Sequence, residues 1–235
     1  MFSTLKQNTY IHNHNVVNTD MQSVKSWAEQ NQYHLGIGYK RDNLFFMDIP
    51  KNASKSINAS WWQAYKGWHP DNEMNYHLKN IGDAIPVIPL RDPVKRFRQC
   101  ILEIIYISYE TDDHESPDHF DEWVHTKFND QWQQFEYEDG FFDKHFYRQV
   151  DHCIGLDLSK CDFVFVDNGK LSEDFKSRYN INLGFHNKST DNKIKQELYH
   201  EYEDQFNQID DDRIAEVYSL DYQLLDIARG YYNVT

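Results

Sequence analysis

Short apolar runs alternate along the centre of the chain with segments whose apolar residues recur at helical spacing. The runs that have the length and composition of buried strands are residues 44–49, 84–90 and 161–167. The segments that follow them and have a helical pattern are residues 54–65, 100–107 and 170–181. Strands that alternate with helices predict an α/β fold, a three-layer sandwich in which a central, mostly parallel sheet is flanked by helices.

The two ends of the chain differ from this alternating centre. Residues 1–40 are polar and contain one amphipathic segment and a Gly-containing turn, so we expect a peripheral lead-in there. Residues 191–235 have a helical pattern, with an acidic break at 208–213 that separates two helices. A length of 235 residues suits one large α/β core and is short for two, so we expect a single domain over residues 1–235.

Charge and composition narrow the possible partners. The formal net charge of −14 disfavours broad binding to nucleic acid or to an anionic membrane surface, so any anion site must be local. No apolar run approaches the length of a membrane-spanning helix, and the first residues lack the apolar core of a signal peptide, so we expect a cytoplasmic protein without membrane insertion. The three cysteines form no close metal-binding pair and are expected to be reduced, mostly buried thiols, and a Cys153–Cys161 bridge in an oxidising compartment is the alternative.

Two loops with unusual chemistry follow the first two predicted strands. The first is "DIPKNASKS", residues 48–56, and the second is "LRDPVKR", residues 90–96. Ligands of open α/β sheets bind at the carboxyl ends of the strands. Both loops are therefore expected to face one site.

The first loop has the residue types of a phosphate cradle. Ala53, Ser54 and Ser56 are small enough to let backbone N–H groups approach an anion, and the helix that follows adds its positive N-terminal dipole. Lys51 and Lys55 supply positive charge. The glycines of a P-loop NTPase are missing. A capped helix start with two solvated lysines is the alternative interpretation.

The second loop concentrates positive charge at a predicted helix start. Asp92 and Pro93 form a good cap and first-turn pair, so this segment can be read as a helix start alone. The four cations that lie within eight residues are Arg91, Lys95, Arg96 and Arg98. The helix macrodipole disfavours cations at this end. In a chain of net charge −14 the cluster therefore favours a bound dianion.

At these two loops the sequence resembles the sulfotransferases. "IPKNASKSI" is similar to their 5′-phosphosulfate loop, Pro-Lys-x-Ala/Gly-x-Thr-Ser, and "IPLRDPVKRF" is similar to their 3′-phosphate motif, a strand that ends in Arg-Asp-Pro. Weaker similarities are "DKHFYRQV" to a His-x-x-x-Gln segment, "FVFVD" to the next strand and "FHNKS" to a late Asn-x-Ser stretch. The resemblance covers about residues 44–190 and is closest to carbohydrate-type enzymes. It implies a P-loop-like nucleotide-binding core.

The resemblance also implies a donor and its contacts. The donor is 3′-phosphoadenosine 5′-phosphosulfate (PAPS), and no metal is required. Lys51 would contact its bridging oxygen, and Arg91 would bind its 3′-phosphate. The 5′-phosphate would be held by Ser54, Lys55 and Ser56, together with the loop backbone of Asn52 and Ala53. Lys55 replaces a usual Thr or Ser, and Gln99 replaces a usual Ser that completes the 3′-phosphate site.

Sulfuryl transfer also needs a base for the acceptor hydroxyl. His77 lies where the family often has a histidine, and His69 and His145 are the competing candidates. The negative charge of the chain favours a neutral sugar, a lipid headgroup or a small alcohol as the acceptor.

Two other functions fit parts of the pattern. "FVFVD" ending in Asp167 is typical of a strand that holds magnesium, which would indicate a P-loop-type kinase or NTPase. The substitutions Lys55 and Gln99 suit a non-catalytic nucleotide-binding module of sulfotransferase fold.

Overall fold

The computed structural model describes twelve stretches of the chain. They are residues 9–18, 35–54, 56–57, 60, 76–77, 81–110, 144–184, 193, 196–197, 200, 203–204 and 210–232. Lys55 and His69, for which the sequence predicts roles, lie outside these described residues.

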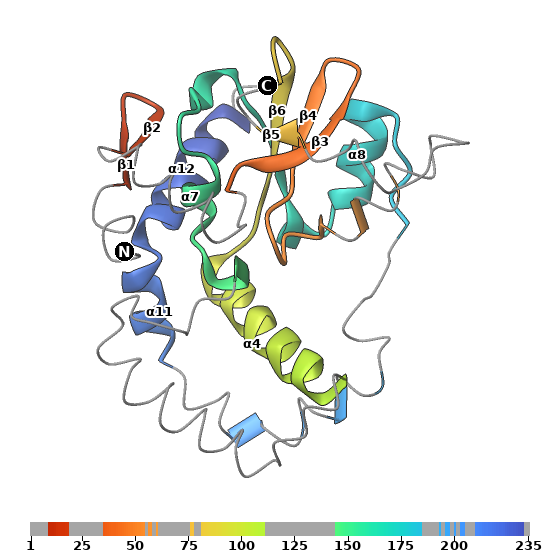
Figure 1. Ribbon diagram of the computed structural model, residues 1–235, viewed down its shortest axis with the longest axis vertical. Helices are drawn as coiled ribbons and strands as arrows, with labels where there is room; N and C mark the ends of the chain where they lie inside the picture. Colours follow the sequence, from red (N-terminus) through yellow and green to blue (C-terminus); the bar gives the residue numbers. More distant parts are fainter. Residues whose placement is uncertain are drawn as a thin grey trace.

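A five-stranded sheet forms the centre of the fold, in the strand order β5-β3-β4-β6-β7 (Figure 1). The strands are β3 (Ile37–Arg41), β4 (Leu44–Met47), β5 (Tyr76–His77), β6 (Ile85–Leu90) and β7 (Asp162–Phe165). Strands β4, β6 and β7 pair in parallel, and β3 pairs antiparallel with both β4 and β5. Strand β3 therefore runs antiparallel to the other four strands. The expected α/β class is confirmed, and the antiparallel strand makes the sheet a mixed one.

Helices follow the parallel strands and pack around the sheet. The described helices are α4 (Pro93–Glu110), α7 (Gln149–His152), α8 (Leu171–Tyr179), α11 (Asp211–Val217) and α12 (Ser219–Tyr232), with short 3₁₀ turns at η3 (Lys144–Phe146), η4 (Leu158–Lys160) and η5 (Val166–Asn168). None of them is both long and apolar enough to cross a membrane.

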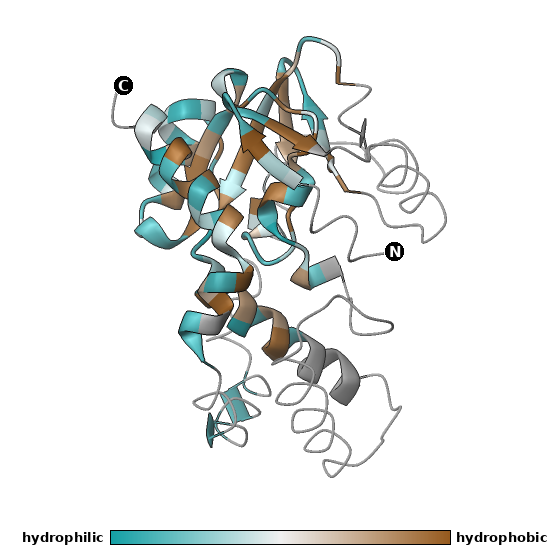
Figure 2. Ribbon diagram, turned by 90° about the vertical axis from the view of Figure 1, so that its left-hand side faces the viewer, coloured by the Kyte–Doolittle hydropathy of each residue, from teal (hydrophilic) through white to brown (hydrophobic). Residues whose placement is uncertain are grey.

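Each parallel strand buries both of its faces. On β4, Phe45 and Met47 join a core that includes Val150 of α7 and Leu224 of α12. Phe46 between them joins a second core with α8. Figure 2 shows brown, apolar strands in the upper centre of the molecule, beside helices that carry both teal and brown residues. Burial on both faces explains why these strands are continuous apolar runs in the sequence.

Helix α4 begins as the sequence predicts. Pro93 occupies its first position, and the side chain of Asp92 accepts a hydrogen bond of 3.0 Å from the backbone N–H of Lys95. Asp92 therefore satisfies one of the N–H groups that a helix start leaves without an intrahelical partner. The helix extends to Glu110, past the predicted end at residue 107.

The Gly-containing turn expected in the lead-in is "LGIGYK", residues 35–40, and this interpretation is wrong for most of that segment. Only Leu35 and Gly36 form the turn, and β3 follows. Gly38 lies opposite Met47 of β4, and a Cβ on it would come within 2.0 Å of the Phe46 carbonyl oxygen. Glycine is needed at this position because the neighbouring backbone lies so close, whereas the prediction took it as a mark of irregular structure.

A β-hairpin near the start of the chain was also missed. Strands β1 (Thr9–His12) and β2 (Asn15–Asn18) are joined by Asn13 and His14, which have φ of 45° and 69°. Positive φ at both central residues is the condition for a type I′ turn. Val16 of β2 is 1% exposed and belongs to the core, so this part of the expected lead-in is packed into the fold.

All three cysteines are free thiols. Cys100 and Cys153 are buried, as expected, and Cys161 is half-buried.

Candidate functional site

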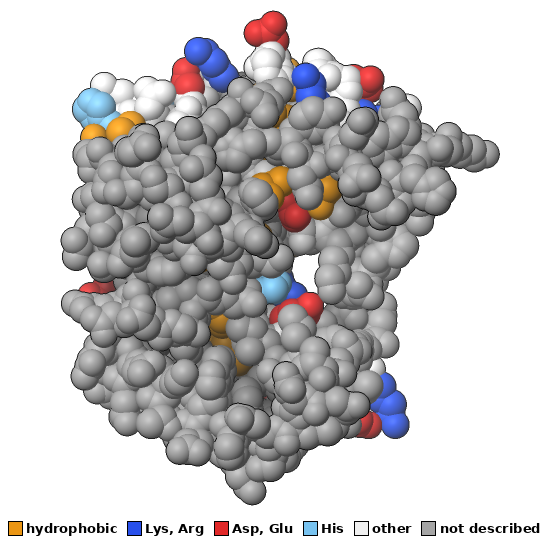
Figure 3. Space-filling model, in the orientation of Figure 1, with side chains coloured by type: hydrophobic (Ala, Val, Ile, Leu, Met, Phe, Trp, Pro, Cys, Tyr) orange, Lys and Arg blue, Asp and Glu red, His pale blue; other side chains and the backbone are white. Residues whose placement is uncertain are grey.

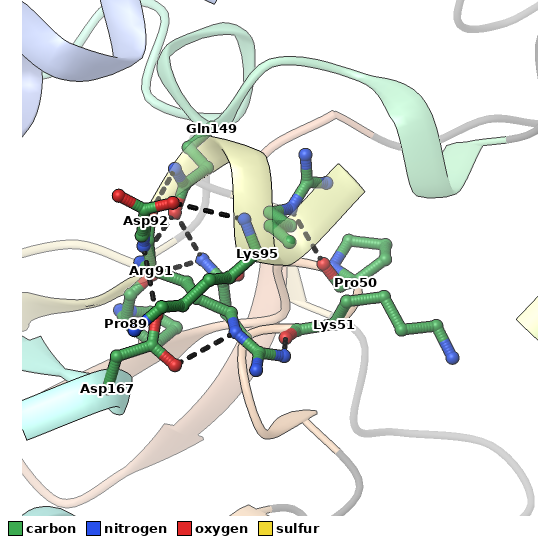
Figure 4. Close-up of polar contacts among 10 residues, drawn as sticks. Pro50, Lys51, Pro89, Arg91, Asp92, Lys95, Gln149 and Asp167 are labelled. Atoms are coloured by element: carbon green, nitrogen blue, oxygen red, sulfur yellow. Dashed lines mark hydrogen bonds and ion pairs between the residues drawn. The ribbon is translucent and has the colours of Figure 1, made fainter. Parts of the chain in front are cut away.

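Three loops meet at the carboxyl edge of the sheet, where β4, β6 and β7 end side by side. Arg91, directly after β6, joins all three. Its Nη1 donates to the carbonyl oxygen of Lys51 at 3.2 Å, and its Nε donates to Oδ1 of Asp167 at 3.1 Å (Figure 4). Asp167 accepts a second hydrogen bond, of 3.1 Å, from the backbone N–H of Asp92. The two loops singled out in the sequence are therefore in direct contact.

The backbone after β4 has an unusual conformation. Lys51 has φ of 67° and Ala53 has φ of 60°, and both are non-glycine residues in the left-handed region. Such residues cost about 1–3 kcal/mol each and cluster at ligand-binding sites. Left-handed residues that alternate with residues of negative φ turn backbone N–H groups into a concave anion-binding nest. The backbone N–H of Asn52 already donates to the Ile49 carbonyl oxygen at 3.1 Å, so a nest at this loop would have to use the N–H groups that follow Asn52.

Arg96 of α4 holds this loop from the protein side. Its side chain is 1% exposed, and its Nε donates to the carbonyl oxygen of Pro50 at 3.0 Å. The other two guanidinium nitrogens donate to the carbonyl oxygens of Tyr147 and His145 at 2.7 and 2.9 Å. Arg96 therefore ties the first loop to the segment before α7, and its guanidinium is used inside the protein.

Gln149 connects the two loops from the protein interior. Its Oε1 accepts hydrogen bonds from Nδ2 of Asn52 at 2.6 Å and from the backbone N–H of Arg91 at 2.9 Å. Its Nε2 donates to the carbonyl oxygen of Arg91 at 2.8 Å. Asn52 also donates from Nδ2 to the carbonyl oxygen of Pro89 at 2.7 Å. Asn52 and Gln149 are fully buried, so this amide network fixes the distance between the loops.

Asp221 of α12 completes the network. Its carboxylate accepts from the backbone N–H groups of Gln149 and Val150 at 3.0 and 2.9 Å, which caps the start of α7. Burial raises the pKa of Asp221 to about 6, although the nearby Arg96 and the two N–H groups oppose the rise. Burial, followed by the charge of Arg96, lowers the pKa of His152 on the same short helix to about 3.

These two groups predict a distinctive pH dependence of stability. Between about pH 4 and 6 the folded state retains a proton on Asp221 that the unfolded chain loses, so this group makes the protein less stable as pH rises. In the same range the unfolded chain protonates His152 and the folded state does not, so this group makes the protein more stable as pH rises. Each group changes the free energy of unfolding by about 1.4 kcal/mol per pH unit. Because the two changes have opposite signs, they largely cancel in the wild type.

Replacing Asp221 with asparagine should remove one of the two opposing contributions and leave the rise of stability with pH that comes from His152. The free energy of unfolding of Asp221→Asn should rise with pH by about 1.4 kcal/mol per unit more steeply than that of the wild type between pH 4 and 6, measured by urea unfolding. Asp226→Asn, which removes an exposed carboxylate from the same helix, is the control. Parallel curves for Asp221→Asn and the wild type would contradict the assignment.

Lys51 is engaged by a carboxylate. Its Nζ lies 2.8 Å from Oε2 of Glu103 on α4, and the two side chains are 15% and 7% exposed. In Figure 4 the side chain of Lys51 extends away from Arg91 and Asp167. Side chains of both charge signs are also visible together near the centre of the face in Figure 3. Of the three cations assigned to the donor, the two that the structure describes, Lys51 and Arg91, each pair with an acid.

The charge cluster after β6 has partners within the chain. Arg91 pairs with Asp167, Arg96 binds three carbonyl oxygens, and Arg98 pairs with Asp211 of α11 at 2.7 Å. Lys95 is exposed. The four cations therefore do not by themselves require a bound dianion, and the case for an anion rests on the loop backbone together with Lys51 and Arg91.

The structure places the other predicted donor contacts as follows. Ala53 and Ser54 are half-buried at the start of a helical turn, where the N–H of Ile57 donates to the Ala53 carbonyl oxygen at 3.0 Å. Ser56 is 9% exposed in the same turn. Asn52 uses its side-chain N–H groups and its backbone N–H inside the protein, so its role is to tether the loops. Gln99 is half-buried on α4.

The structure describes two of the three candidate bases, His77 and His145. His77 is in β5 and pairs with Ile37 of β3, which puts its backbone at the edge of the sheet. His145 is half-buried in η3, and its carbonyl oxygen accepts from Arg96 and from Sγ of Cys100. The identity of the base stays a prediction.

Four residues that hold the site together were given no such role from the sequence, although Gln149 lies in the segment "DKHFYRQV" that resembles a His-x-x-x-Gln stretch. They are Gln149, Asp221 and Glu103, together with Asp167 in its role as partner of Arg91. The only sign of Glu103 in the sequence is that it is a charged residue inside an otherwise apolar helical stretch. Among the described residues, no three His, Cys, Asp or Glu side chains gather as metal ligands would.

Comparison with known proteins adds no family to this geometry. No family model, no curated protein and no solved structure matches the chain.

Proposed function

We propose that the chain is a sulfotransferase that moves a sulfuryl group from PAPS to an acceptor hydroxyl. One observation carries the proposal: the two loops that resemble the donor-binding motifs touch, with Arg91 Nη1 3.2 Å from the carbonyl oxygen of Lys51. The proposal includes a three-layer sandwich with a P-loop-like nucleotide-binding core. Apolar cores on both faces of the sheet support that part of it.

Each residue has a distinct part in this proposal. The left-handed backbone at Lys51 and Ala53, with Ser54 and Ser56 at the helix start, would bind the 5′-phosphate. Arg91 would bind the 3′-phosphate, for which a planar guanidinium is well suited. Asp167 holds this guanidinium through Nε, which leaves its orientation fixed when a phosphate arrives.

Lys51 would act on the transferred group. In the reaction the bond between sulfur and the bridging oxygen breaks, a bond from sulfur to the acceptor oxygen forms, and the hydroxyl proton passes to a base. Negative charge develops on the bridging oxygen as the nucleotide leaves. The ammonium of Lys51 would stabilise that charge, and the acceptor would be a neutral sugar, a lipid headgroup or a small alcohol.

Calorimetric titration with 3′-phosphoadenosine 5′-phosphate (PAP), without magnesium, tests the donor site. The wild type should bind PAP, and it should bind ATP with lower affinity. Arg91→Ala should weaken PAP binding by about 10- to 100-fold, because hydrogen bonds to charged groups are worth about 1.5–3 kcal/mol. Lys95→Ala, which removes an exposed cation from the same helix start, is the matched control and should change the affinity little.

Other outcomes of this titration would overturn the proposal. Equal losses of PAP affinity in Arg91→Ala and Lys95→Ala would mean that the ligand responds only to the overall positive charge of the cluster and not to a specific contact with Arg91. Preference for ATP with magnesium would favour the kinase-type alternative, in which Asp167 at the end of β7 would hold the metal.

A non-catalytic nucleotide-binding module is the second candidate. The observation that favours it is that Lys51 and Arg91 both pair with carboxylates. It predicts PAP binding without transfer from PAPS to a panel of sugars and alcohols. Release of PAP that depends on an added acceptor would exclude it.

A further inference from the structure

The ion pair between Lys51 and Glu103 links the donor loop to the middle of α4. Glu103 lies in the third turn of that helix and is 6% exposed. Acidic side chains are rarely this buried, and those that are usually have a charged partner. The 2.8 Å contact with Lys51 Nζ supplies one.

One face of α4 holds the loop at two successive residues. Arg96 and Glu103 are seven positions apart, so they lie on the same side of the helix. Arg96 binds the Pro50 carbonyl oxygen, and Glu103 binds the ammonium of the next residue, Lys51. The backbone of Lys51 is anchored separately, through its carbonyl oxygen, by Arg91. A change in the position of the Lys51 ammonium therefore needs no movement of the loop backbone.

Stability alone does not account for this pair. Removing two charges from water costs about as much as their attraction returns, and apolar residues of similar size often serve as well. A carboxylate 2.8 Å from the ammonium offsets the positive charge that an incoming anion would meet, so the pair would weaken the attraction of Lys51 for such an anion.

We propose that Glu103 is a positioning residue that competes with the donor for Lys51. It holds the ammonium against α4 while the site is free of nucleotide and releases it to the 5′-phosphate side of the donor. The affinity for PAP is lowered by this competition, which eases release of the nucleotide product. The inference rests on the proposed function, since it assigns Lys51 to the 5′ side of that nucleotide.

A double-mutant cycle tests the competition. Calorimetry would measure PAP binding to the wild type, Glu103→Gln, Lys51→Met and the double variant. Glu103→Gln should raise the affinity for PAP by about tenfold, the lower end of the couplings known for close charge pairs. The same substitution should have no effect in the Lys51→Met background, and none on the affinity for adenosine 3′-monophosphate, which lacks the 5′-phosphate.

Two more variants complete the set. Asp226→Asn changes the net charge equally from an exposed position on α12 and should leave PAP affinity unchanged. Glu103→Met, an apolar replacement of similar size, is the second variant should Glu103→Gln not fold, which thermal unfolding would report.

Each result has one meaning. A wild type that binds PAP, with unchanged affinity in Glu103→Gln, overturns the role of Glu103 and leaves the donor site standing. The role of Glu103 is also overturned if Glu103→Gln raises the affinity for PAP in the Lys51→Met background, or raises the affinity for adenosine 3′-monophosphate. Absence of PAP binding in the wild type and in every variant overturns the proposed function itself.

Discussion

Replacing Lys51 with methionine should lower the turnover of sulfuryl transfer by about 100- to 1,000-fold, while the affinity for PAP falls by no more than about tenfold. The ammonium meets its largest negative charge only as the bridging oxygen departs, so its loss affects the transition state more than the bound ground state. Methionine keeps most of the length of the side chain, which retains packing against α4. Steady-state kinetics and calorimetry on one preparation would measure both quantities.

The control for Lys51→Met must remove a lysine without touching the site. Lys95→Met does so at an exposed position two residues into α4. Because Lys51→Met leaves Glu103 buried beside an apolar group, the double variant with Glu103→Gln should be assayed as well. Equal losses of turnover and affinity in both Lys51 variants would assign Lys51 to binding and remove its role in charge stabilisation.

The largest expected effect on stability belongs to Arg96. Arg96→Met should lower the free energy of unfolding by about 3–5 kcal/mol, because it leaves the carbonyl oxygens of Pro50, His145 and Tyr147 without their buried donor. Urea unfolding followed by fluorescence would measure the change.

Arg98→Met is the matched comparison on the same helix. Arg98 is 31% exposed and pairs with Asp211, which is 56% exposed, so its loss should cost less than about 1 kcal/mol. Similar losses for Arg96→Met and Arg98→Met would show that the three carbonyl contacts contribute little to stability.

The parallel strands and their loops could be predicted from the sequence for a physical reason. Strands that are buried on both faces must be apolar throughout, so β4, β6 and β7 appear as continuous runs whose observed ends lie within two residues of the predicted ends. The start of α4 was predictable from Asp92 and Pro93, because capping depends on adjacent residues alone. The meeting of the two loops followed from the parallel order of their strands.

The strands and contacts that were missed depend on distant residues. Gly38 indicates a turn in the sequence and is required in β3 only because the Phe46 carbonyl lies beside it. The arginines after β6 suggested a ligand because their acceptors, at Pro50, Tyr147 and Asp167, are remote in the chain. Tertiary contacts of this kind leave no local pattern.

The amide network around Gln149 has a consequence for the order in which the protein is made. Its members come from the loop after β4, the end of β6, helix α7 and, through Asp221, helix α12. Synthesis runs from the N-terminus, so the residues that resemble the donor motifs emerge long before Asp221, 72 positions after Gln149. Both loops are therefore synthesised before α12, and Asp221 can cap α7 and complete the network only once the last described helix has been made.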